Sequence, residues 1–232
     1  MTTVKYHQAR VVLLVSLVVT ALLYLVPYFA ALAYPFMLLS TVAHEMGHGL
    51  TALLVGGSFQ RFEMWSDGSG VAHVASPSSA LARAAVAGGG LVGPAVAAAA
   101  GFAWGRTVRG ARSCLLAFAF MLLVALLLVV RGFFGFFFVA LVAACCAAAA
   151  LRAAGEMAQL VLVFFSVQLA LSVFSRGSYL FTPVALTANG RMPSDVGQIA
   201  QALLLPYWFW GAACGLVSLA VLVYGLKVYW RR

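Results

Sequence analysis

Long apolar runs with very few charges decide what this 232-residue chain can fold into. A membrane-spanning α-helix needs about 20 such residues, and a helix pairs its backbone polar groups within itself, as lipid requires. The runs predict an all-α polytopic membrane protein with seven spans, or six if the Arg131-Gly132 turn lies within one kinked element. We expect a single membrane domain over residues 1–232, with spans at about 11–33, 36–56, 80–104, 113–131, 133–151, 157–176 and 203–227.

The composition excludes several classes of protein. The chain is 65% hydrophobic and 8% charged, which rules out an ordinary soluble domain. Its net charge of +9 comes from basic residues near the ends of apolar runs, a pattern typical of membrane-flanking anchors and not of nucleic-acid binding. With seven spans these residues divide evenly between the two faces, so they do not predict the orientation. The four cysteines lie in apolar runs without CxxC spacing, which predicts buried thiols.

The segment His44-Glu45-Met46-Gly47-His48 places three polar side chains inside the second apolar run. On a helix, residues four apart lie on one face, so His44 and His48 can bind one zinc ion while Glu45 acts as the general base. The alternative is a polar contact between helices. Such side chains are costly in hydrocarbon unless they are paired or bind metal. The motif therefore predicts a zinc site within the membrane.

Residues 57–76, which follow this run, are too polar to span a bilayer and predict a short membrane-associated β-hairpin. Side chains alternate loosely before an Asp67-Gly68 turn, and a second short strand follows it. The functional interpretation is a strand edge that pairs with an extended substrate, and the alternative is an interfacial loop. The residues that we expect to contact a substrate are Phe62, Met64, Val71, His73 and, in the polar stretch 177–202, Asn189.

A zinc site usually needs a third protein ligand, and the chain offers few candidates. Besides the motif, its acids and histidines are Glu63, Asp67, Glu156, Asp195, His7 and His73. Asp67 fits a turn, and Glu156 fits an ion pair with Arg152 four residues earlier. Asp195 has no such local partner, so we favour it as the third ligand; the alternative role is a helix N-cap or first-turn acid. The two residues on the hairpin, Glu63 and His73, remain further alternatives.

Together these features resemble those of site-2-protease-type intramembrane zinc metallopeptidases, in particular the short bacterial members that lack a PDZ domain. The resemblance rests on HEMGH within a span, the hairpin after it, the run Gly88-Gly89-Gly90-Leu91-Val92-Gly93-Pro94 and a late Asp. It covers most of residues 35–104 and, more weakly, 186–212. In that family the Asp ligand lies within Leu-Asp-Gly, which follows an Asn and then a Pro. Here Asn189, Pro193 and Asp195 occur in that order, and Ser194 and Val196 flank the Asp.

The resemblance implies that His44, His48 and Asp195 bind zinc and that Glu45 is the catalytic base. It also implies a membrane-spanning or membrane-bound peptide substrate, a place in the lipid bilayer of a bacterial plasma membrane, an active site towards the cytosolic side and an N-terminus inside. It leaves homo-oligomer formation open.

Three functions compete at this point. The first is a zinc-dependent intramembrane endopeptidase. The second is a catalytically inactive member of the family that binds membrane partners as a scaffold. The third, a small transporter, is disfavoured because the spans at 113–131, 133–151 and 203–227 contain almost no polar residues that could line a path.

Overall fold

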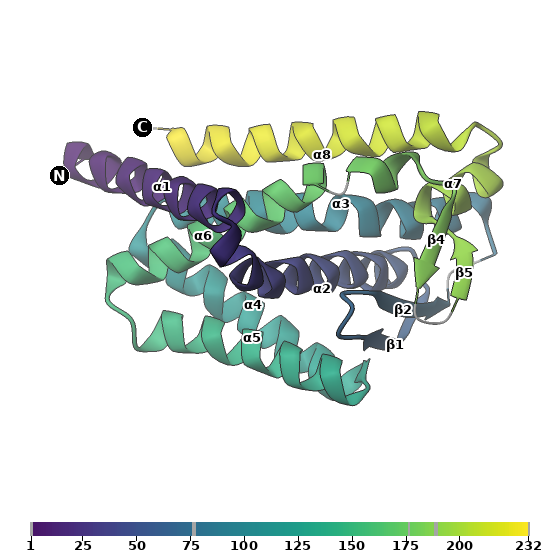
Figure 1. Ribbon diagram of the computed structural model, residues 1–232, viewed down its shortest axis with the longest axis horizontal. Helices are drawn as coiled ribbons and strands as arrows, with labels where there is room; N and C mark the ends of the chain where they lie inside the picture. Colours follow the sequence, from purple (N-terminus) through teal and green to yellow (C-terminus); the bar gives the residue numbers. More distant parts are fainter. Residues whose placement is uncertain (1, 76–77, 176, 188–189, 232) are drawn as a thin grey trace.

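The structure is a computed structural model that describes residues 2–75, 78–175, 177–187 and 190–231 (Figure 1). Within these residues the α-helices are α1 (Thr2–Leu25), α2 (Ala30–Leu54), α3 (Ala80–Gly105), α4 (Val108–Leu128), α5 (Phe133–Leu151), α6 (Gly155–Ser175), α7 (Asp195–Leu203) and α8 (Tyr207–Trp230). Two short 3-10 helices are η1 (Pro27–Phe29) and η2 (Gly177–Phe181). The strands are β1 (Ser58–Met64), β2 (Gly70–Ala75), β3 (Val130–Arg131), β4 (Val184–Thr187) and β5 (Gly190–Pro193).

Among the described residues, six helices are long and apolar enough to cross a membrane. They are Gln8–Leu25, Ala80–Gly105, Val108–Leu128, Phe133–Leu151, Gly155–Phe181 and Tyr207–Trp230. The predicted class, an all-α polytopic membrane protein with six or seven spans and a small hairpin, is therefore confirmed with six. The reason considered for six, one kinked element across Arg131-Gly132, is wrong, because α4 and α5 are separate spans. The seventh expected span falls on α2, whose motif residues His44, Glu45 and His48 lower its mean hydropathy.

Two local features differ from the sequence-based expectation. The helix expected over residues 11–33 ends earlier, because α1 stops at Leu25 and η1 separates it from α2. Arg152 follows the end of α5, whereas Glu156 lies in the first turn of α6, so the two do not share a helix. Glu156 is instead placed where the dipole of α6 favours an acid.

Both ends of the described chain lie at one end of the helical bundle, and the strands lie at the other (Figure 1). The Tyr229 hydroxyl donates to the carbonyl of Ala9 at 2.6 Å, and the Arg10 guanidinium lies 5.4 Å from the centre of the Trp230 ring. Helices α1 and α2 follow one another from the end that holds the termini towards the end that holds the strands. The HEMGH motif, late in α2, therefore lies towards the strand end.

Helices α2 and α3 pack through glycine. A Cβ on Gly47 would lie 2.3 Å from the carbonyl oxygen of Gly89, and one on Gly93 would lie 2.8 Å from the carbonyl oxygen of Ala43. Small residues allow such close approach of helix backbones in lipid. The contact brings the motif face of α2 directly against α3.

The predicted hairpin forms and gains a third strand. Strands β1 and β2 pair antiparallel, and β3 joins the other side of β1 in parallel, which gives the order β2-β1-β3 and leaves β2 at an edge. The Phe62 N–H donates to the carbonyl of Val129 at 2.8 Å, just before β3. At Arg131-Gly132 the sequence indicates only a turn, because two residues are too few to show a strand pattern. Strands β4 and β5 form a separate antiparallel pair.

Candidate metal centre

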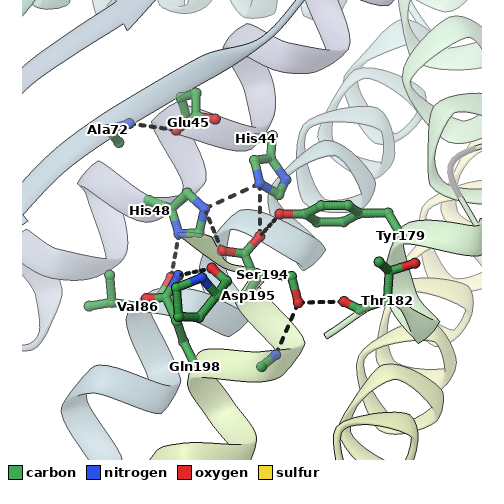
Figure 2. A network of polar contacts seen from close by, with 12 residues as sticks. His44, Glu45, His48, Ala72, Val86, Tyr179, Thr182, Ser194, Asp195 and Gln198 are labelled. Atoms are coloured by element: carbon green, nitrogen blue, oxygen red, sulfur yellow. Dashed lines mark hydrogen bonds and ion pairs between the residues drawn. The ribbon is translucent and has the colours of Figure 1, made fainter. Parts of the chain in front are cut away.

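The two histidines of the motif share one face of α2 and point at a common place (Figure 2). Their Nε2 atoms lie 3.2 Å apart. The Nδ1 of His48 lies 2.9 Å from the carbonyl oxygen of Val86 on α3, and a carbonyl can only accept, so Nδ1 carries the hydrogen. In a neutral imidazole this leaves the Nε2 lone pair directed at the site, which is the arrangement that a metal-binding histidine needs.

Asp195, the first residue of α7, completes the cluster from a distant part of the chain. Its Oδ2 lies 3.0 Å from Nε2 of His44 and its Oδ1 lies 3.3 Å from Nε2 of His48. The residue is only 3% exposed. The N-cap of α7 is Ser194, whose hydroxyl accepts from the N–H of Gly197 at 3.1 Å. The N-cap role considered for Asp195 therefore belongs to its neighbour, whereas its other alternative place, an acid in the first turn of the helix, is confirmed.

The spacing of the three groups suits zinc. In a tetrahedral site with bonds of about 2.0–2.2 Å, the ligand atoms lie about 3.3–3.6 Å apart. The two Nε2 atoms lie 3.2 Å apart, and Asp195 lies 3.0 Å from His44 through Oδ2 and 3.3 Å from His48 through Oδ1, which is at or slightly below this range. Each residue offers one ligand atom within 4.8 Å of the others. Two imidazoles and a carboxylate are a ligand set typical of catalytic zinc, with room for a fourth, non-protein ligand. The residues present therefore fit the ion.

Glu45 lies next to this cluster without belonging to it. Its Oε2 accepts a hydrogen bond of 2.7 Å from the backbone N–H of Ala72 on β2 (Figure 2). The strand can come this close because Gly70 has no side chain: a Cβ there would lie 2.7 Å from Thr41 Cγ2 and 3.0 Å from Glu45 Cγ. The carboxylate is thus held at the edge of the site, where a general base is needed.

Tyr179 is a member of the site that the sequence does not predict. Its hydroxyl donates to Oδ2 of Asp195 at 3.3 Å, and its ring lies edge-on to His44 with centroids 6.0 Å apart. It comes from η2, between α6 and the strands β4 and β5. A single tyrosine in a polar stretch has no spacing that relates it to a distant motif, so no sequence signal was available.

Two adjoining cavities open onto the cluster. The smaller, of about 100 Å³, is lined by the three candidate ligands together with residues of β2, β4 and β5. The larger, of about 340 Å³, shares the lining residues His44, Glu45, Gly70, Tyr179 and Ala185 with it. Several hydroxyls line the larger cavity, those of Ser40, Thr41, Ser69, Ser172 and Ser178. The site thus adjoins a space, lined by both polar and apolar residues, that can admit water.

The residues expected to contact a substrate do not all lie near this space. Val71 lines the smaller cavity. Phe62 and Met64 are 0% and 3% exposed and pack in a core cluster with residues of α2, α4 and α5, so they support β1 and are not open to a substrate. The sequence shows that they share one face of the strand but not that this face is covered. Asn189 lies outside the described residues.

The alternative third ligands have other partners. Oε2 of Glu63 lies 3.3 Å from both Arg61 Nη2 and His73 Nε2, and neither Glu63 nor His73 lines the two cavities at the cluster. Asp67 accepts from the N–H of Ser69 at 2.8 Å, as expected for a turn. The Ser69 hydroxyl, followed by this N–H, holds the pKa of the Asp67 carboxyl below its usual value.

Comparison with known proteins agrees with the geometry. No curated protein and no solved structure matches the chain. The model of one protein family, described as Peptidase M50B-like, matches residues 14–225, which include the HEMGH helix, the hairpin and Asp195. The chain therefore belongs to the M50B-like peptidase family and is a member of the site-2-protease type.

Proposed function

We propose that the protein is a zinc-dependent intramembrane endopeptidase that cleaves a membrane-spanning or membrane-bound peptide. The observation that carries this proposal is the convergence of His44, His48 and Asp195 at ligand spacing, with Glu45 beside them, in a bundle of six apolar spans. Membership of a peptidase family supports the same reaction class.

The three ligands would hold the zinc, and Glu45 would carry the proton. When bound, zinc supplies Lewis acidity that polarises a carbonyl and lowers the pKa of water. Glu45 accepts a proton from the attacking water as the water oxygen bonds to the scissile carbonyl carbon. Glu45 then donates this proton to the amide nitrogen as the C–N bond breaks, which regenerates the carboxylate.

The substrate would have to be extended where it is cut, because the peptide bonds of a helix are shielded by the surrounding backbone. The edge of β2 that pairs with no other described strand lies beside Glu45, which accepts the Ala72 N–H, and Val71, Ala72 and Val74 line the smaller cavity. An edge strand offers unpaired backbone groups that bind an extended peptide with little dependence on its sequence. This supports a substrate segment that unwinds and adds to β2.

The test combines metal content and cleavage. Purified protein in detergent is expected to hold one zinc per chain and to cleave single-span peptides that contain a helix-breaking residue. Glu45→Gln is expected to retain the zinc and lose at least about 100-fold in rate, because Gln cannot act as a base. His44→Ala and His48→Ala are expected to lose both zinc and cleavage.

Two outcomes would overturn the proposal. Normal zinc content in either histidine variant would separate the motif from the metal, and a near wild-type rate in Glu45→Gln would remove its role as the base. One zinc per chain without cleavage of any unwound membrane peptide would favour the scaffold function.

A further inference from the structure

The carboxylate of Glu45 is held by a backbone group of another element. Oε2 accepts the Ala72 N–H at 2.7 Å, a short bond of the charge-assisted kind. Glu45 is 6% exposed, so little water competes for this contact. A general base works only from a defined position. The contact is therefore in a place to affect the rate of the reaction.

The Ala72 N–H is available because of the register of the hairpin. Ala72 lies opposite Phe62, and the N–H of Phe62 points away from β2, to Val129. In an antiparallel pair, residues that face each other exchange both of their hydrogen bonds or neither. The Ala72–Phe62 pair exchanges neither, so the Ala72 N–H leaves the sheet at the free edge of β2, towards α2.

A series of contacts holds this edge on α2. The Tyr34 hydroxyl donates to the carbonyl of Ser66, and the Thr41 hydroxyl donates to the carbonyl of Gly68 at 2.8 Å. The contact of Glu45 with Ala72 continues the series. The partners on α2 follow one another from Tyr34 through Thr41 to Glu45, while those on the hairpin run from the turn at Ser66 and Gly68 to Ala72 on β2.

Glycine makes this close packing feasible. A Cβ on Gly68 would lie 2.5 Å from Met37 Cε, and one on Gly70 would lie 2.7 Å from Thr41 Cγ2. The hairpin therefore lies against the motif face of α2 with its backbone, and the distance between Ala72 and Glu45 is set by several contacts along the helix.

From these contacts we propose that Ala72 is a positioning residue for catalysis: its backbone N–H orients the Glu45 carboxylate. The inference rests on the proposed function. It assigns the hairpin a second role, since docking of β2 on α2 then governs the turnover rate as well as the capture of substrate.

The sharpest test removes the backbone N–H of residue 72 and leaves its side chain unchanged. Incorporation of lactic acid at position 72 of the full-length protein, by nonsense suppression, replaces the N–H by oxygen. We expect kcat to fall about 10- to 100-fold with KM and zinc content unchanged, since the lost bond is to a charged group. The matched control is lactic acid at Ala75, also on β2 but paired with Ser58.

Three results would overturn the inference. The first is an equal loss of kcat with the ester at position 75, and the second is an effect of the ester at 72 on KM alone. The third concerns the NMR signal of the Ala72 amide proton, identified by its absence from the variant that carries lactic acid at position 72. This signal is expected to move upfield in Glu45→Gln, and no movement would mean that the contact does not form. The NMR measurement needs no catalysis, so it tests the contact even if the wild-type protein cleaves nothing and the proposed function fails.

Discussion

Ser194 and Asp195 divide two tasks that one acidic residue often performs alone. Ser194 caps α7 with its hydroxyl, and the Asp195 carboxylate is directed at His44 and His48. Because the cap does not depend on Asp195, a substitution there can test metal binding with little effect on the helix.

Asp195→Asn is expected to weaken zinc binding by more than the roughly 10- to 100-fold that loss of an outer hydrogen bond produces, because a neutral amide is a poor zinc ligand. Cleavage should be lost with it, and the helical circular dichroism should stay unchanged. Zinc titration against a competing chelator provides the measurement. Ser194→Ala, which should cost about 1 kcal/mol of stability, is the control for damage to α7. Wild-type zinc affinity in Asp195→Asn would show that Asp195 is not a ligand.

Tyr179 is expected to act on the metal through Asp195. Tyr179→Phe keeps the ring against His44 and removes only the hydroxyl that donates to Asp195. Zinc affinity should fall about 10- to 100-fold, as for other outer hydrogen bonds to metal ligands. Substitution by cobalt allows the absorption spectrum to report any change in ligand geometry. Tyr28→Phe, at a side chain that is 93% exposed, should change neither quantity. An unchanged affinity and spectrum in Tyr179→Phe would reduce the contact to packing.

The residues of the site differ in how far the sequence reveals them. The spacing of His44 and His48 follows from the helical period, and Asp195 follows from the scarcity of other acids. Tyr179 reaches the site only through the path of η2, and the Ala72 N–H is a backbone group that every residue but proline has. Such contacts depend on tertiary structure alone, so neither period nor composition could predict them.

At the scale of the elements, the glycine-rich run of α3 packs against the candidate metal centre. A Cβ on Gly90 would lie 2.2 Å from Nε2 of His48, whereas one on Gly88 would meet nothing within 4 Å. The sequence predicts close helix packing here, and the structure adds that one of these glycines makes room for a candidate ligand.

Gly90→Ala is therefore expected to displace the His48 ring and to lower zinc affinity and cleavage by about 10-fold or more, in line with a loss of ligand orientation. Gly88→Ala is the matched control. This variant should leave zinc affinity and cleavage unchanged, and its helix α3 should be slightly more stable, since Ala is the better helix former. The measurement is zinc affinity beside thermal unfolding for the two variants. Equal behaviour of the two variants would mean that His48 adapts without loss.

At the scale of the whole molecule, the basic residues are unevenly placed. The described ones on elements or connections at the end with the termini are Lys5, Arg10, Arg106, Arg109, Arg112, Arg152, Lys227 and Arg231. Those at the end with the strands are Arg61, Arg83, Arg131 and Arg191. The even division expected for seven spans thus disappears with six, because both termini then lie on one face. The positive-inside rule now favours a cytoplasmic face for the termini.

A reporter at the C-terminus tests this orientation. Green fluorescent protein fused after residue 232 is expected to fluoresce, and alkaline phosphatase fused there is expected to be inactive, as for a cytoplasmic end. The metal centre lies towards the opposite end, so the family expectation of an active site near the cytosol and an N-terminus inside cannot both hold for this arrangement. An active phosphatase fusion would contradict the charge rule and place the hairpins on the cytoplasmic face.

The distance along the chain between α2 and α7 also has a consequence for how the protein is made. Asp195 is synthesised about 150 residues after His48, which takes roughly 8–30 s at 5–20 residues per second. During that time the polar stripe of α2, formed by His44, Glu45 and His48, is in the membrane without Asp195. The proposed zinc ion can then be bound tightly only by a nearly finished chain, so metal would mark completed assembly rather than guide its first steps. A ribosome that stops before α7 would leave this stripe uncovered, a defect that membrane quality control can recognise.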